Sequence, residues 1–178
     1  MAHVCDSVPQ PELAGWFGKI PALGDFVTRR LPPSFVDSWD EWLSTELVAA
    51  QQALDEAWLS AYQHAPILRF ALMPGAVDRV RWFGVWVPSF DRVGRRFPLT
   101  FAVSGPSGAE AAQRWWAALV ATGLRALQPS CDADCVDEAL LAFLGRQDAV
   151  DDCAELFERR VDLAAASACC DQLLELFV

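Results

Sequence analysis

The sequence is poor in positive charge and in histidine, and each shortage excludes a class of function. Its 178 residues hold 14 Lys and Arg against 24 Asp and Glu, a net charge of −10. Nucleic-acid binding depends on clustered cations, so we expect no nucleic-acid partner. The two histidines are His3 and His64. Neither has an evident partner for general-base catalysis, and both are interpreted as structural or exposed.

Long apolar runs and the common catalytic signatures are also missing. The longest stretch without a charged residue covers thirteen positions, 97–109, and contains prolines and glycines, so no membrane insertion is expected. Residues 1–13 carry acids and prolines instead of a basic start followed by an apolar run; they predict a flexible N-terminus and a cytoplasmic protein. Neither Gly-x-Ser-x-Gly nor a phosphate-binding Gly-x4-Gly-Lys-[Ser/Thr] loop occurs, and no enzyme is predicted.

The six cysteines do not form a recognisable zinc pattern. They include a Cys-x3-Cys pair at Cys131 and Cys135 and a vicinal pair at Cys169 and Cys170. Disulfide frameworks belong mainly to small secreted chains, so we expect free, partly buried thiols. No metal and no cofactor are predicted.

Apolar residues, by contrast, are abundant. They make up 53% of the chain, and eight Trp and eleven Phe are among them, which predicts one domain over residues 14–178 with a dense core. The charge is uneven along the chain, because residues 101–178 hold 13 acidic and 5 basic side chains. This acidic part is interpreted mainly as solvated helix faces.

The apolar patterns predict an α/β (α+β) fold with a central antiparallel meander sheet flanked by helices. A short strand is expected at 15–21, and apolar residues at 3–4 spacing predict a helix from Pro33 and Ser34 to about His64. Three further strands follow at 67–73, 82–87 and 99–103, with connections too short for a parallel crossover. Strand 82–87 lacks polar alternation, which is typical of a central strand covered on both faces. Helices are expected in the C-terminal third, packed on the sheet, at 109–127, 134–145 and, as one or two helices, 150–177.

Organised cationic groups concentrate in two segments, 15–25 and 88–98. The loop after strand 82–87 holds three arginines and Asp91 within a few residues, with Gly94 to allow a tight reversal. Arginines in this pattern favour binding of a carboxylate or phosphate. Alternatively, one arginine pairs with Asp91, or with Asp25, and only holds the hairpin. The candidate partner-binding residues are Lys19, Asp25, Arg29, Arg30, Asp91, Arg92, Arg95 and Arg96.

The same segments resemble a known family. Residues 15–27 (Gly-Trp-Phe-Gly-Lys-Ile-Pro-Ala-Leu-Gly-Asp-Phe-Val), 29–32 and 35–43 look like the N-terminal signature of the TagF family, and 66–70 and 88–100 resemble its next two motifs. The resemblance implies an accessory protein of the bacterial type VI secretion system. It further implies post-translational repression through the forkhead-associated scaffold protein, alongside the threonine-phosphorylation pathway, on a mixed α/β fold and without established catalytic residues.

Two other functions stay open beside this one. A structural adaptor could recruit helices through a Trp-rich surface, with the arginines only supporting the turn. A carboxylate-based hydrolase could use Asp25 or Asp91, although no spacing between a nucleophile and a base supports it. The oligomeric state is left open.

Overall fold

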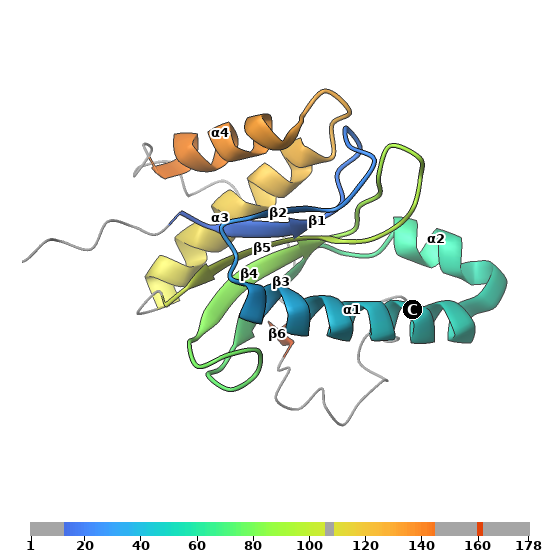
Figure 1. The fold of residues 1–178 in the computed structure, drawn as a ribbon, viewed down its shortest axis with the longest axis horizontal. Coiled ribbons are helices and arrows are strands. Elements are labelled where there is room, and N and C mark those ends of the chain that lie inside the picture. The colour runs from blue at the N-terminus through green and yellow to red at the C-terminus, as the bar shows by residue number, and fades with distance from the viewer. Residues whose placement is uncertain (1–12, 106–108, 145–159, 162–178) are drawn as a thin grey trace, which may run out of the picture.

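The computed structural model describes residues 13–105, 109–144 and 160–161. They form three layers, in which a six-stranded sheet lies between two pairs of helices (Figure 1). Helices α1 and α2 cover one face of the sheet, and α3 and α4 cover the other. The predicted α+β class, with helices flanking an antiparallel sheet, is confirmed.

The strands, in chain order, are β1 (Gly15–Gly18), β2 (Val27–Arg29), β3 (Leu68–Leu72), β4 (Trp82–Val87), β5 (Leu99–Ser104) and β6 (Arg160–Val161). The helices are α1 (Pro33–Leu54), α2 (Trp58–Gln63), α3 (Ala109–Ala126) and α4 (Ala133–Leu144). None of the helices in the described part of the chain is long and apolar enough to cross a bilayer.

The sheet order is β2-β1-β5-β4-β3-β6. Strands β3, β4 and β5 pair antiparallel as consecutive neighbours, which confirms the predicted meander. Strand β6 pairs parallel to β3 at the edge, so residues 160 and 161 form a strand within the region 150–177, where one or two helices and no strand were expected. Backbone hydrogen bonds to an open sheet edge can override a helical sequence pattern over so short a segment. The rest of that predicted helical region lies outside the described residues.

Strand β4 is buried over its whole length because both of its faces are covered. Trp82 and Trp86 pack into the cluster beneath α1, whereas Phe83, Val85 and Val87 pack into the cluster beneath α3. Alternate residues of a strand point to opposite faces, so each helix layer receives its own set of side chains. The prediction for this strand, drawn from its lack of polar alternation, is confirmed.

Gly84 in β4 allows neighbouring atoms to approach the backbone so closely that a larger residue would collide with them. A Cβ atom there would overlap the ring of Phe70 and the carbonyl oxygen of Phe101. Gly123 plays the same part in α3, where a Cβ atom would lie 2.7 Å from a methyl carbon of Val87. These two glycines therefore permit close packing within the sheet and of α3 on its face.

The predicted helix to His64 is interrupted. Helix α1 ends at Leu54, a 3-10 turn follows at Asp55–Ala57, and α2 then runs to Gln63. Asp55 adopts φ = 44°, which no helical periodicity reveals. The break redirects the chain so that α2 carries Tyr62 to the 88–98 loop.

Cys131 and Cys135 form a disulfide at the start of α4, so the expectation of free thiols is wrong for this pair. Their Cα atoms are 5.3 Å apart, because the four-residue separation spans about one turn at the helix entry. The remaining cysteines, Cys5, Cys153, Cys169 and Cys170, lie outside the described residues.

Candidate functional site: two loops around a buried aspartate

The loop after β1 (residues 19–26) and the loop between β4 and β5 (residues 88–98) lie against each other at one end of the sheet (Figure 1). The backbone N–H of Arg92 donates to the carbonyl of Leu23 at 2.8 Å. The hydroxyl of Ser89 donates to the carbonyl of Lys19 at 2.7 Å. Strand β1 pairs directly with β5, and this pairing brings the two loops together.

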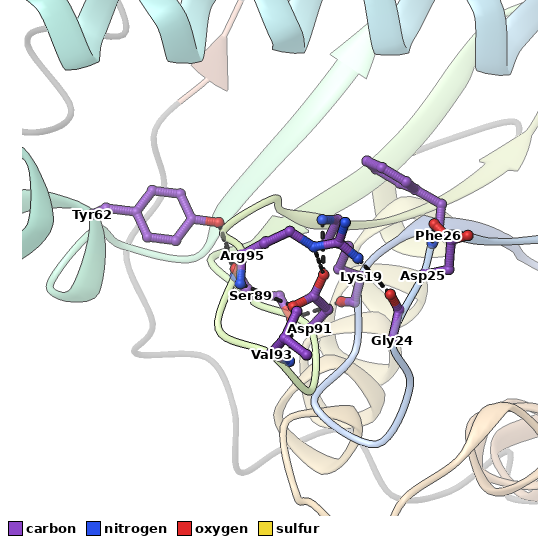
Figure 2. Close-up of polar contacts among 9 residues, drawn as sticks. All are labelled: Lys19, Gly24, Asp25, Phe26, Tyr62, Ser89, Asp91, Val93 and Arg95. Carbon is purple, nitrogen blue, oxygen red and sulfur yellow. Dashed lines mark hydrogen bonds and ion pairs between the residues drawn. The ribbon is translucent and has the colours of Figure 1, made fainter.

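The side chain of Asp91 is fully buried where the loops meet, and both of its oxygens are occupied (Figure 2). Oδ1 accepts the backbone N–H groups of Val93 and Arg95 at 3.1 and 2.9 Å. Oδ2 accepts Nζ of Lys19 at 2.9 Å and Nε of Arg95 at 2.7 Å. The carboxylate therefore organises the turn from inside and joins it to the first loop.

Burial alone would raise the pKa of Asp91, because it penalises the charged form. Hydrogen bonds from Lys19 and Arg95, together with the charge of Lys19, outweigh the burial and hold the pKa well below its ordinary value. A carboxylate with so low a pKa is a weak base, and its lone pairs already have donors. Its chemistry suits structural support better than proton transfer.

Lys19 is itself buried, with 5% of its surface exposed. Besides its ion pair with Asp91, its ammonium group lies 4.8 Å from the centre of the Phe26 ring. Phe26 in turn packs edge-on against Phe97 at 4.8 Å between ring centres. The only cation of the first loop is thus used inside the protein and is unavailable to a partner.

Arg95 completes the connection between the loops, because its Nη2 donates to the carbonyl of Gly24 at 2.5 Å (Figure 2). Of the two interpretations of this loop, an arginine that pairs with Asp91 inside the turn is the arrangement observed. Asp25 forms no ion pair with Arg92 or Arg95 among the described residues; its carboxylate accepts the N–H of Phe26 at 2.8 Å.

Tyr62 and Ser89 also belong to this network, although neither is among the candidate residues predicted from the sequence. The hydroxyl of Tyr62 donates to the carbonyl of Ser89 at 2.8 Å and accepts the N–H of Ser89 at 3.1 Å. Burial raises the pKa of Tyr62 well above its ordinary value and keeps the hydroxyl neutral. Tyr62 is the single tyrosine of the chain and lies at the end of an otherwise apolar helix stripe. This position is the feature of the sequence that could have indicated a buried hydroxyl with a hydrogen-bonding role.

Arg29 and Arg30 lie at a separate place, beside α4. Nη2 of Arg30 lies 2.6 Å from Oδ1 of Asp137, and this oxygen also accepts the indole N–H of Trp16 at 2.9 Å. Arg29 lies 3.8 Å from the other oxygen of Asp137 and 3.9 Å from Asp134. Burial would raise the pKa of Asp137, but these donors lower it. Arg29 and Arg30 therefore connect β1 and β2 to α4 through Asp134 and Asp137. From the sequence, both acids were expected on a solvated helix face.

Arg92 and Arg96 remain exposed at the surface of the second loop, and among the described residues neither forms an ion pair. Val93, between them, is 69% exposed. Arg96 also lines a surface pocket of about 340 Å³ between this loop and helices α1 and α2. Of the predicted cationic candidates, these two face outward without an internal partner in the described structure.

Within the described ranges, no three His, Cys, Asp or Glu side chains gather as a group that could hold a metal ion. The grouped polar atoms of the two loops contact one another instead. The two loops therefore form a surface held from inside by the Asp91 network, on which Arg92 and Arg96 are exposed.

Comparison with known proteins identifies the class. A family model described as the TagF N-terminal domain, type VI secretion system-associated, matches residues 15–143. This match takes in β1–β5 and α1–α3 in full and nearly all of α4, beyond the motifs at 15–103 on which the resemblance depended. The chain belongs to the TagF family and is a type VI secretion-associated protein.

The fold also occurs in a solved structure. The chain is similar to the protein in the crystal structure of PA0076 from Pseudomonas aeruginosa PAO1, with 37% sequence identity and a TM-score of 0.66. The similarity covers 73% of this chain and 62% of that one, so this chain corresponds to less than two thirds of the other protein's length. No curated protein matches the sequence.

Proposed function

We propose that this protein is a cytoplasmic, non-enzymatic regulator that represses type VI secretion after translation, by binding the forkhead-associated scaffold component. The observation that carries the proposal is the family match over residues 15–143, which includes strands β1–β5 and elements of both helix layers. The fold provides a rigid base, and the two loops at one end provide a surface that can be recognised.

The contacts of the loops favour binding over catalysis. Asp91 is enclosed by donors from Lys19, Val93 and Arg95, and its depressed pKa makes it a poor base. Asp25 is exposed and caps its own loop through the N–H of Phe26. Neither carboxylate therefore has the environment that a hydrolase would need.

The adaptor alternative receives less support. Among the eight tryptophans, Trp16, Trp39, Trp82 and Trp86 are buried in the two core clusters. The other four are partly buried, and none is fully at the surface. A Trp-rich docking surface would need several indole rings in the open.

We propose that Arg92 and Arg96 meet the partner, because both are exposed and neither forms an ion pair among the described residues; Asp25 is exposed on the first loop. Lys19 and Asp91 are buried beneath this surface, and Arg95, which is exposed, is held in the turn by Asp91. Arg29 and Arg30 are engaged by α4. An anionic patch on the scaffold protein would complement the exposed pair.

The test is capture from a bacterium with an active type VI system. Tagged protein should recover the forkhead-associated component, and raised levels of the protein should lower secretion without a change in the amounts of the secretion proteins. Recovery of no type VI component, together with unchanged secretion, would contradict the proposal. A matched sample with a tagged unrelated acidic protein controls for charge.

A further inference from the structure

A pocket beside the second loop combines an apolar lining with one cation. Helix α1 contributes Ser44, Leu47, Val48 and Gln51 to it, α2 contributes Trp58, and the loop contributes Arg96 and Phe97. The α1 positions recur every three to four residues, so they form one stripe along the helix. The family match and the network around Asp91 leave this stripe without a role.

The shape of the pocket suits an extended peptide. From Ser44 to Gln51 the wall follows α1 for seven residues, about 10 Å at the rise of an α-helix, which is the length of roughly three residues of extended chain. The volume of about 340 Å³ lies at the small end of ligand sites. It accommodates one or two side chains and is too small for a large cofactor.

The charge of the pocket selects among peptides. Among the described residues that line the pocket, Arg96 is the single charged one and none is an acid. Arg96 also lacks an ion-pair partner in the described part of the chain, whereas Arg95 next to it is engaged by Asp91. On a protein of net charge −10, such a site favours a carboxylate that the rest of the surface would repel.

We propose that this pocket is the docking site for a short partner segment that presents a bulky apolar side chain beside a carboxylate. The apolar side chain packs against Leu47, Val48 and Trp58, and the carboxylate pairs with Arg96. The inference deepens the proposed function and depends on it only for the identity of the partner. Val48 is 53% exposed, so a new charge there would block the site with little effect on the core.

The pocket is tested first with a defined probe, the peptide acetyl-Glu-Leu-Phe-Glu-amide, titrated into isotopically labelled protein and followed by NMR. Amide shifts should change at Leu47, Val48, Gln51 and Arg96. Arg96→Glu should weaken binding about tenfold, and so should a probe with glutamines in place of glutamates. Arg79→Glu is the matched control, because it makes the same charge change on an exposed arginine outside the pocket and outside the two loops.

Absence of shifts at these positions, or equal weakening by both charge reversals, would overturn the docking site. Self-association of the protein that depends on Val48, measured by sedimentation, would assign the pocket to a second copy and would also overturn it. Unchanged circular dichroism and melting temperature of each variant establish that the fold is intact.

A second arm uses the purified forkhead-associated protein with Val48→Asp. Loss of at least tenfold in affinity supports the pocket as the site used by that partner. If the peptide binds but the wild-type protein does not capture the forkhead-associated component, the proposed function fails and the docking site stands. If capture occurs and is unaffected by Val48→Asp, the docking site fails and the proposed function stands.

Discussion

Asp91 shows how one buried carboxylate can shape a whole loop. Its four hydrogen bonds join three donors of its own turn to Lys19, which lies 72 positions earlier in the sequence. A buried charge of this kind is tolerated only where partners satisfy it, and removal of one partner leaves the other uncompensated. The ion pair between Lys19 and Asp91 therefore orders the two loops, and its effect on any ligand is indirect.

Lys19→Met tests this internal role. The substitution keeps the length of the side chain but leaves Asp91 with one cation fewer in a dry site, and we expect a loss of about 3 kcal/mol in the free energy of unfolding. Urea denaturation followed by tryptophan fluorescence measures it. Arg96→Met, an exposed change on the second loop, should stay within about 0.5 kcal/mol of wild type. Equal stability of the two variants would contradict the role given to Lys19.

The depressed pKa of Asp91 predicts how stability changes with pH. An aspartate in the unfolded chain titrates near a pKa of about 3.9, so the contribution of Asp91 is complete above that pH and is lost as the pH falls toward its lower folded pKa. The melting temperatures of wild type and Asp91→Asn should therefore differ most at neutral pH and converge below about pH 4. A constant difference from pH 7 to pH 3 would contradict the assignment. Asp137, whose pKa is also lowered, is present in both proteins and cancels from the comparison.

At the scale of elements, β4 is the centre of the fold, and Gly84 is its most constrained position. Gly84→Ala places a methyl group against Phe70 and the backbone of Phe101, and we expect a cost of about 1–3 kcal/mol. Gly24→Ala is the control, because a Cβ atom there meets nothing nearer than 3.5 Å. Thermal unfolding of both variants makes the comparison. A Gly84→Ala protein as stable as the control would show that β4 and β3 pack more loosely than described.

The elements themselves could largely be predicted from the sequence, because their signals are local. The unbroken apolar run of β4, the stripe of α1 and the short connections of the meander each depend on neighbours within a few residues. The turn at Asp55 and the strand at Arg160–Val161 could not, since each depends on contacts made elsewhere in the fold. The disulfide between Cys131 and Cys135 could not be predicted either, because a Cys-x3-Cys spacing alone does not separate a disulfide from two free thiols.

The candidate site was predicted as a set of residues but not as an arrangement. Charge and glycine content were enough to single out the two loops. Which cations face inward depends on pairings across 72 residues for Lys19 and 107 for Arg30, and no local pattern records such distances. Asp137 looked like one more solvated acid for the same reason.

For the whole molecule, the central feature is the contrast between a chain of net charge −10 and a small outward-facing cationic surface. The core clusters on both faces of the sheet hold the supporting elements, and the two loops sit at one end of them. A partner steered by charge would meet this end in preference to the acidic remainder. The proposal therefore requires that Arg92 and Arg96 contact the partner and are not merely solvent-exposed.

Titration calorimetry with the purified forkhead-associated type VI protein tests this claim most directly. The double variant Arg92→Glu/Arg96→Glu is compared with wild type and with Arg79→Glu/Arg81→Glu, which makes the same charge change on exposed arginines of the β3–β4 connection. The account predicts wild-type affinity for the control pair and at least tenfold weaker binding for the loop pair. Equal affinities for all three proteins, or equal weakening of both double variants, would contradict it.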